Sequence, residues 1–165
     1  MKRILFLCTG NSCRSQMAEV LMNHLGQGRF EALSAGSKAA GYVHPLAIKT
    51  LKEAKLPTEG LRSKSWEVYQ GQPFDFVITV CDRAKESCPV WPGQPVTAHW
   101  SFEDPAEAAG TDEQKERIFH KVFIEIQTRI RLFLALPMET LSRIELEKRV
   151  RNIGQSAVEQ KRCCA

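Results

Sequence analysis

The chain has 165 residues, which is enough for one domain with a substantial hydrophobic core and too few to favour two. Hydrophobic residues make up 43% of the sequence and charged residues 25%, as in an ordinary globular protein. The net charge of +4 is not gathered in a basic patch, because residues 138–165 hold six Lys and Arg against four Asp and Glu, while the rest holds 17 against 15. This charge pattern gives no support for a nucleic-acid partner.

The sequence also bears on location and on the use of cysteine. Two basic residues at positions 2 and 3 precede only four apolar residues, which is too short a run for a secretory signal, and no stretch is long enough to span a membrane. We therefore expect a cytoplasmic protein with no membrane partner. Thiols stay reduced in the cytoplasm, so the six cysteines predict chemistry or metal binding rather than a fixed disulfide framework.

The first half of the chain alternates between predicted strands and helices. Residues 4–7 are uniformly apolar, which is typical of a short strand buried on both faces. Apolar residues at helical spacing follow over 17–25, and residues 30–35 are predicted to form a second strand. A helix is expected to begin at Pro45, and residues 56–73 are loop-rich with one helical turn near Trp66.

The second half continues the alternation. Residues 76–80 have the strongest strand pattern in the chain and run directly into Cys81, and residues 96–100 form a weaker strand. The longest helix is expected over about 112–135, where a continuous apolar stripe ends before Pro137. This order predicts a three-layer α/β fold with a parallel sheet, in which ligands bind beyond the carboxyl ends of the strands. Cys8 and Cys81 both lie at such ends.

The segment CTGNSCRS, residues 8–15, joins the first strand to the first helix. Backbone N–H groups of such a turn and the positive end of the helix point at one spot, which makes an anion cradle. We expect the amides of residues 9–14, that is Thr9, Gly10, Asn11, Ser12, Cys13 and Arg14, to bind an oxyanion. The fork of Arg14 would hold two of its oxygens.

The same positive field favours a thiolate at Cys8, so we expect a lowered pKa and nucleophilic attack by this residue. Ser15 follows the arginine and is placed to hydrogen-bond the Cys8 sulfur. The alternative is an ordinary strand-to-helix turn in which Cys8 is a small buried hydrophobe. Cys13 is expected to be a packing residue.

Motifs along the chain resemble the thioredoxin-coupled arsenate reductases, which have the fold of the low-molecular-weight protein tyrosine phosphatases. The matching stretches, in order, are CTGNSCRSQMAE from residue 8, LSAG at 33–36, HP at 44–45, VITVCD at 77–82, CP at 88–89 and HWSFEDPA at 99–106. The resemblance covers about residues 2–136. It implies a four-stranded parallel sheet flanked by helices, and a domain over 1–137 followed by a C-terminal extension over 138–165.

The resemblance also implies the chemistry. Asp104 matches the general acid of both families, although an Asp-Pro pair is common in ordinary turns. In the reductases, a first thiol attacks arsenate, a second attacks the first and releases arsenite, and a third takes over the disulfide. These thiols correspond to Cys8, Cys81 and Cys88, and the final pair is reduced by thioredoxin, with glutaredoxin as an alternative donor. The six residues 82–87 contain no long apolar side chain, so this segment could rearrange.

Two other functions stay open. A low-molecular-weight tyrosine phosphatase would need Cys8, Arg14 and Asp104 but neither Cys81 nor Cys88. A non-catalytic oxyanion-binding or redox-sensing module would use the same loop without turnover. Phosphate and sulfate are expected to compete with arsenate in every case, since all are tetrahedral anions.

No metal or other cofactor is expected. A zinc site at Cys81, Cys88 and His99 lacks the usual ligand spacing. Some related reductases bind potassium behind the loop, at positions that resemble Asn11, Glu19 and Ser34. Here Lys64 stands where an acidic ligand would be expected, and its ammonium group argues against potassium activation.

The C-terminal extension has a thin apolar stripe and many charges. It is expected to be a loose helix or a disordered tail. It ends in Cys163 and Cys164. These thiols either have no role or relay electrons or capture arsenite.

Overall fold

The computed structural model describes residues 1–163, with side chains through residue 155 apart from that of residue 87. Its sheet has four parallel strands in the order β2-β1-β3-β4. The strands are β1 (Lys2–Cys8), β2 (Phe30–Gly36), β3 (Phe76–Thr79) and β4 (Val96–His99). The α-helices are α1 (Arg14–Leu25), α2 (Pro45–Glu53), α3 (Asp82–Ser87), α4 (Asp112–Leu134) and α5 (Arg143–Cys163), and two short 3₁₀ helices are η1 (Trp66–Tyr69) and η2 (Pro105–Glu107). The predicted three-layer α/β fold is confirmed.

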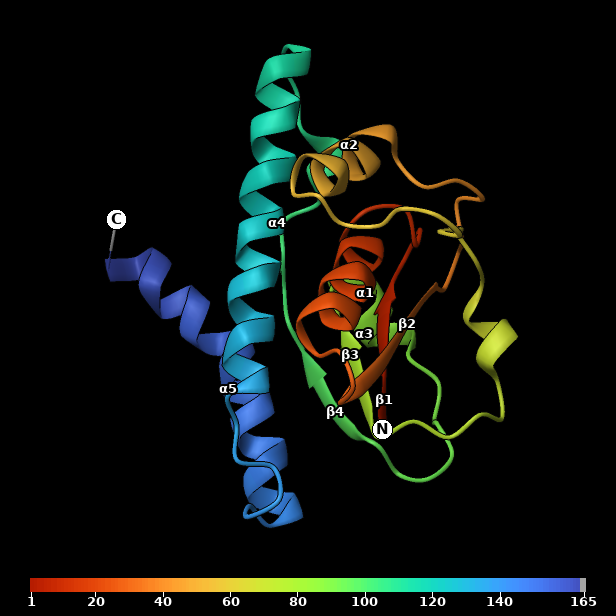
Figure 1. Ribbon diagram of the computed structural model, residues 1–165, viewed down its shortest axis with the longest axis vertical. Helices are drawn as coiled ribbons and strands as arrows, with labels where there is room; N and C mark the ends of the chain where they lie inside the picture. Colours follow the sequence, from red (N-terminus) through yellow and green to blue (C-terminus); the bar gives the residue numbers. More distant parts are fainter. Residues whose placement is uncertain (164–165) are drawn as a thin grey trace.

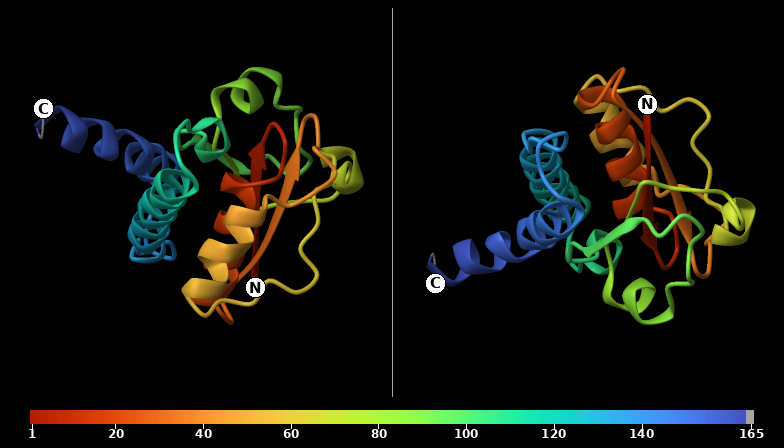
Figure 2. Two further views of the ribbon diagram at one scale, coloured as in Figure 1. Left: turned by 90° about the horizontal axis from the view of Figure 1, so that it is seen from above. Right: turned by 90° about the horizontal axis from the view of Figure 1, so that it is seen from below.

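The sheet is the centre of the core. Residues 4–7 of β1 are fully buried, which explains their uniformly apolar pattern. Figure 1 shows α1 in front of the sheet with α4 beside it, and Figure 2 shows α3 on the other side of the sheet. Phe133 of α4 packs on Phe30, Phe76 and Trp100, with ring centroids 5.0–5.9 Å apart. These contacts fix α4 against three strands or strand ends.

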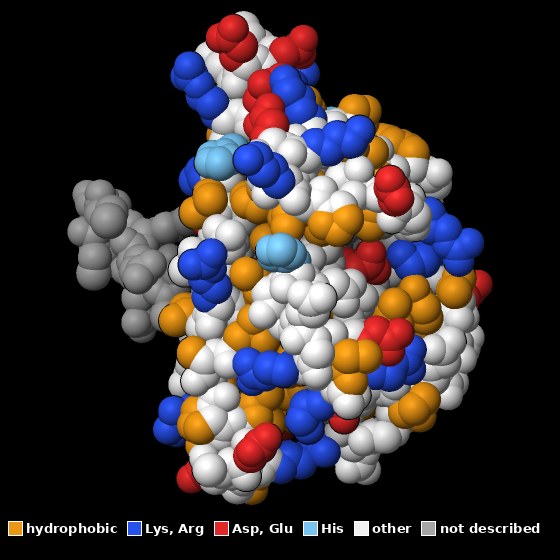
Figure 3. All heavy atoms as spheres, in the orientation of Figure 1, with side chains coloured by type: hydrophobic (Ala, Val, Ile, Leu, Met, Phe, Trp, Pro, Cys, Tyr) orange, Lys and Arg blue, Asp and Glu red, His pale blue; other side chains and the backbone are white. Residues whose placement is uncertain are grey.

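Helix α4 matches the expected long helix closely. It begins at a capping box, in which Thr111 Oγ1 accepts a hydrogen bond from the Gln114 amide and the Gln114 side chain accepts one from the Thr111 amide. On the face drawn in Figure 3, its cationic and anionic side chains are interspersed. Within the described residues, no helix is both long and apolar enough to cross a membrane.

Helix α3 was not expected, because the sequence suggested only a polar, rearrangeable segment over 82–87. Asp82 opens the helix, where a negative charge interacts favourably with the free amides. Ala84, within the helix, is fully buried. One small apolar residue in six is too weak a periodic signal to predict a helix.

In the C-terminal extension, residues 143–163 form helix α5. Val150 and Ile153 are buried, and the Trp100 indole N–H donates to the Val150 carbonyl at 3.0 Å. Arg151 Nε donates to the Thr97 carbonyl on the outer edge of β4. Helix α5 therefore covers an otherwise unpaired sheet edge. The thiols of the residues at 163 and 164 lie outside the described side chains, and the division at residue 137 stays a prediction.

Candidate active site

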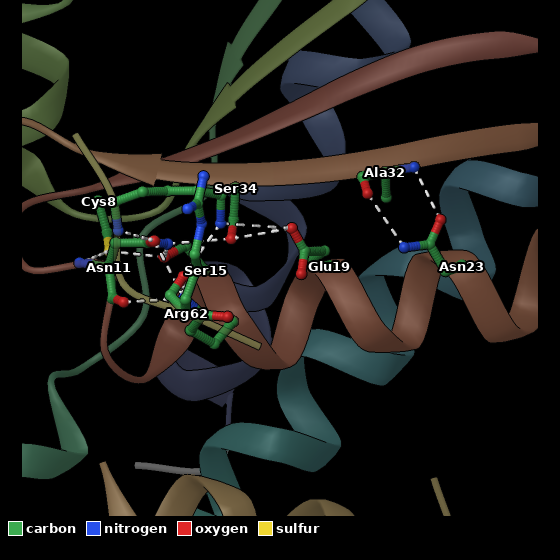
Figure 4. Close-up of polar contacts among 10 residues, drawn as sticks. Cys8, Asn11, Ser15, Glu19, Asn23, Ala32, Ser34 and Arg62 are labelled. Atoms are coloured by element: carbon green, nitrogen blue, oxygen red, sulfur yellow. Dashed lines mark hydrogen bonds and ion pairs between the residues drawn. The ribbon is translucent and has the colours of Figure 1, made fainter. Parts of the chain in front are cut away.

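The loop between β1 and α1 encloses the sulfur of Cys8, which ends β1 and is buried. The Asn11 amide donates to the Cys8 sulfur at 3.1 Å, and the Ser15 hydroxyl lies 2.8 Å from it. The Ser15 oxygen accepts a hydrogen bond from the Asn11 side-chain N–H at 2.8 Å, so its own proton is free to point at the sulfur (Figure 4). Two donors therefore face Cys8 from one loop.

The backbone conformation and the buried side chain of Asn11 hold this loop in shape. Its φ of 48° is left-handed, a conformation that Asn tolerates better than most residues and that turns its amide toward the sulfur. Its side chain is fully buried, donates to Ser34 at 3.0 Å, and accepts at Oδ1 from Gln16 and from the Lys64 amide. All of its polar side-chain atoms are thus used in holding the loop.

The carbonyls of the loop point outward. Those of Thr9, Gly10 and Ser12 accept hydrogen bonds from the backbone amides of residues 38, 40 and 44 respectively. At the start of α1, Cys13 occupies the cap position without a side-chain hydrogen bond to the helix amides. These carbonyls are thus turned away from the Cys8 sulfur, toward which the Asn11 amide points.

Gly36 permits the close approach of β2 to this loop. A Cβ atom at Gly36 would lie 2.4 Å from the Thr9 carbonyl oxygen and 3.0 Å from the Asn11 amide. Any side chain would thus displace the loop backbone. The LSAG motif contained this signal, but the sequence alone did not show which partner the glycine approaches.

The pKa of Cys8 differs from the expectation. Burial raises it above its ordinary value, and the Cys81 sulfur acts in the same direction. The Ser15 hydroxyl, the Arg14 guanidinium and the Asn11 amide lower it, but by less in total. The prediction of a lowered pKa is wrong for this pocket because it counted the donors and not the loss of water. Burial likewise raises the pKa of Cys13 to about 12, in line with a packing role.

Arg14 and Asp104 lie together at the mouth of the loop. Arg14 donates to the Phe102 carbonyl at 3.0 Å, and its guanidinium lies 3.5 Å from an Asp104 carboxylate oxygen. The other carboxylate oxygen of Asp104 caps η2 by accepting from the Ala106 amide. The structure thus brings Arg14 and Asp104 together, and Asp104 also has the turn role that was its alternative explanation.

Cys81 lies beside the loop, directly after the register of β3 against β1. Leu7 is paired with Thr79, and the Val80 amide donates to the Leu7 carbonyl at 2.8 Å, so continuing this register puts Cys81 level with Thr9. The Thr9 hydroxyl lies 3.3 Å from the Cys81 sulfur. Cys81 is buried and is not disulfide-bonded.

Cys88 lies at the opposite end of α3 and is half-buried. A helix rises about 1.5 Å per residue, so seven steps separate the two Cα atoms by roughly 10 Å. A disulfide needs Cα atoms about 4.4–6.8 Å apart. A bond between Cys81 and Cys88 therefore requires α3 to open.

The region proposed for potassium in related proteins contains an ion pair. Ser34 donates to Glu19 at 3.2 Å, and the Lys64 ammonium lies 3.9 Å from the same carboxylate oxygen. Burial raises the pKa of Glu19, which Lys64 opposes, and burial lowers the pKa of Lys64. The positive charge behind the loop is thus supplied by a side chain. Among the described residues, no three His, Cys, Asp or Glu side chains cluster as metal ligands.

Sequence reasoning missed the contacts of His99. Its ring nitrogens lie 2.8 Å from Thr79 Oγ1 and 2.8 Å from an Asp82 carboxylate oxygen. Since a carboxylate only accepts, Nε2 carries the proton in this contact. His99 thus links β3 and β4 to the first residue of α3. Histidine at a strand end gave no signal of this role.

With this geometry described, the chain can be placed among known proteins. Residues 3–150 match the family described as low molecular weight phosphotyrosine protein phosphatase. The chain belongs to this family.

The similar proteins include several arsenate reductases. One from Halalkalibacterium halodurans is 42% identical over 132 residues, which is 80% of this chain and 94% of the relative. A solved structure of an arsenate reductase in the phosphate-binding state is 31% identical, with a TM-score of 0.66 over 82% of this chain and 98% of the other. The thioredoxin-dependent arsenate reductase of Corynebacterium glutamicum is 29% identical, with a TM-score of 0.61 over 79% and 59%. The resemblance seen in the motifs is thereby confirmed.

Proposed function

We propose that this protein reduces arsenate to arsenite in arsenic detoxification, using reduced thioredoxin as its electron donor. The loop amides of residues 9–14 and the Arg14 guanidinium bind the arsenate oxygens. Phosphate and sulfate compete for this cradle because they share the tetrahedral shape and negative charge. The binding of phosphate by a similar arsenate reductase supports this step.

In the first step, the Cys8 thiolate attacks arsenic and a hydroxide leaves. Asp104 in its protonated form donates the proton that converts this hydroxide to water. The Ser15 hydroxyl and the Asn11 amide stabilise the sulfur anion before attack and again when it leaves. Burial raises the pKa of Cys8, so its thiol has to lose a proton before this attack.

In the second step, the Cys81 thiolate attacks the Cys8 sulfur. A sulfur–sulfur bond forms, the sulfur–arsenic bond breaks, and its electron pair leaves with arsenic as arsenite. The contact between Thr9 and Cys81 carries this proposal, because it places a second thiol against the anion loop. A phosphatase has no need of a thiol there.

In the third step, Cys88 attacks Cys81 and releases the Cys8 thiolate, which leaves a disulfide between residues 81 and 88. This transfer requires α3 to open, as argued above. A dithiol donor then reduces the pair by exchange. Thioredoxin is proposed because a similar reductase is thioredoxin-dependent; glutaredoxin is the alternative. The cytoplasmic location expected for this chain is compatible with either donor.

The test compares two activities in one set of variants. Arsenate with thioredoxin, thioredoxin reductase and NADPH measures reduction, and an aryl phosphate measures hydrolysis. Cys81→Ser should abolish the first and retain the second, whereas Cys8→Ser should abolish both. Reduction at the wild-type rate by Cys81→Ser would contradict the relay.

A second candidate is phosphatase activity toward phosphotyrosine, favoured by family membership and by the assembled Cys8, Arg14 and Asp104. Its expected signature is aryl phosphate turnover by the wild type without arsenate reduction. Anion binding without turnover of either substrate would indicate the non-catalytic module.

A further inference from the structure

Arg129 is a buried cation of helix α4 that has no part in the reaction steps above. Its side chain is 4% exposed, and its Nε atom makes no hydrogen bond with any described residue. Burial lowers the pKa of Arg129, and the Glu125 carboxylate opposes this effect only in part. A methionine would fill a similar volume without the cost of burying a charge, so packing alone does not explain an arginine at this position.

The guanidinium of Arg129 holds the segment that follows β4. Figure 1 shows this segment beside α4. Nη1 of Arg129 donates to the Ser101 carbonyl at 2.8 Å, and the guanidinium carbon lies 4.2 Å from the centroid of the buried Phe102 ring. A planar cation makes both contacts at once, because its hydrogen bonds lie in its plane and the ring meets its face. One side chain therefore fixes two successive residues of the segment.

The same helix also reaches this segment at the surface. The Lys121 ammonium lies 2.9 Å from a Glu103 carboxylate oxygen, and both side chains are exposed. Exposed ion pairs of this kind contribute little to stability, because water and salt screen them. The contacts of Arg129 are shielded from water, so they are expected to hold the segment more firmly.

The segment that Arg129 holds also contacts Arg14. The Phe102 carbonyl accepts a hydrogen bond from Arg14 Nη1 at 3.0 Å. Two residues later, an Asp104 carboxylate oxygen lies 3.5 Å from Nη2 of the same guanidinium. A shift of the Phe102 backbone would thus remove the acceptor that sets the direction of the Arg14 fork.

We propose that Arg129 is a positioning residue for oxyanion binding. It fixes the backbone at Phe102, whose carbonyl orients the Arg14 guanidinium toward the loop after β1. Arg129 acts through these two residues and not on the anion itself. This inference rests on the anion-binding step of the proposed function, and it applies equally to arsenate and to a phosphate ester because both use that step.

The test measures oxyanion binding without turnover, in the reduced, full-length protein. Inorganic phosphate is titrated against the alkylation of Cys8 by iodoacetamide, and the protection gives a dissociation constant for phosphate. We expect Arg129→Met to raise this constant about tenfold, as for the loss of a hydrogen bond to a charged group. Arg129→Lys keeps the charge but lacks the planar fork, so it should recover only part of the affinity.

Arg131→Met is the matched control. Arg131 lies on the exposed side of the same helix, so this variant should bind phosphate as the wild type does. An unchanged phosphate constant in Arg129→Met, or an equal loss in Arg131→Met, would overturn the proposal.

A double-mutant cycle separates positioning from a general loss of structure. Arg14→Lys retains a cation, so its weaker binding of phosphate can be measured at higher phosphate concentrations. If Arg129 acts through Arg14, Arg129→Met should change the phosphate constant by less than about twofold in this background. The same tenfold loss in both backgrounds would show a merely structural role and end the proposal. If Arg129→Met does not fold, Arg129→Lys takes its place in the cycle.

The outcome for Arg129 is distinguishable from that for the proposed function. A wild type that phosphate does not protect would end the anion-binding step, and this inference with it. Protection of the wild type without any arsenate reduction would contradict the reductase function alone, since the phosphate titration involves neither Cys81 nor Cys88.

Discussion

The hydroxyl oxygen of Thr9 lies 3.3 Å from the sulfur of Cys81. Thr9 directly follows Cys8, the proposed nucleophile, and Cys81 follows the neighbouring strand, so the contact joins the loop after β1 to a second thiol. Neighbouring parallel strands lie about 4.8 Å apart, so their carboxyl ends are close together in any such sheet. The register of β1 on β3 is thus what makes the proposed electron transfer short.

Replacing this hydroxyl should slow the second step. In Thr9→Val the Cys81 thiolate loses a hydrogen-bond partner inside a buried site, and we expect arsenite release to fall about tenfold, which corresponds to roughly 1.4 kcal/mol. The measurement is arsenite release in a single turnover by rapid quench. Thr9→Ser keeps the hydroxyl and should release arsenite near the wild-type rate. If Val and Ser behave alike, the contact has no part in the exchange.

The pH dependence of Cys8 follows from its raised pKa. The thiolate is the reactive form, so alkylation of Cys8 by iodoacetamide should accelerate as pH rises toward and past the ordinary thiol value of 9.0. Ser15→Ala removes a donor and raises the pKa further, so alkylation at pH 8 should be about tenfold slower. The rate is measured by mass spectrometry of the Cys8 peptide.

Ser12→Ala is the control for this prediction, because the Ser12 hydroxyl contacts the Cys13 sulfur at 3.6 Å instead of Cys8. Inorganic phosphate should protect Cys8 in both proteins. A Cys8 rate that is unchanged in Ser15→Ala would show that the hydroxyl does not stabilise the thiolate.

Much of this architecture is encoded locally. The uniformly apolar run at 4–7, the glycine that closes the strand 30–35 and the apolar stripe of α4 each report burial in their own segment, and those predictions are confirmed. The loop after Cys8 was predictable for the same reason, since its strand, turn and helix are contiguous.

What the sequence did not show depends on contacts between distant segments. Helix α5 gains order from β4, through Trp100 and the Thr97 carbonyl, although its own apolar stripe is thin. The pKa of Cys8 depends on how completely the loop excludes water, which no spacing reveals. His99 acts on α3 through Asp82, and such pairing between a strand and a helix has no periodic signature.

The buried pair behind the loop makes a further prediction. Lys64→Met leaves Glu19 without its neighbouring cation, so the already raised pKa of Glu19 should rise further. A folded-state pKa above the unfolded one makes stability fall as pH rises between the two values. We therefore expect the loss of unfolding free energy, measured in urea, to be larger at pH 8 than at pH 5.

The double variant Lys64→Met with Glu19→Gln should recover much of this loss at pH 8, because it removes the unpaired carboxylate. The single and double variants form a cycle whose coupling energy reports the pair directly. Additive effects at both pH values would mean that Lys64 and Glu19 do not interact. In the wild type, replacing sodium by potassium should leave arsenate reduction unchanged.

Gly154 tests whether α5 is held against the sheet edge. A Cβ atom there would lie 2.4 Å from the His99 carbonyl oxygen and 3.0 Å from a Trp100 ring carbon. Gly to Ala in the middle of an exposed helix normally stabilises by up to about 1 kcal/mol. Here the clash should reverse the sign, and Gly154→Ala is expected to destabilise the protein by about 1–3 kcal/mol.

Asn152→Ala is the control. Asn152 lies on the exposed side of the same helix, so this change should be neutral or slightly stabilising. Thermal unfolding followed by circular dichroism compares the two. Equal behaviour of both variants would mean that α5 does not pack against β4 in solution.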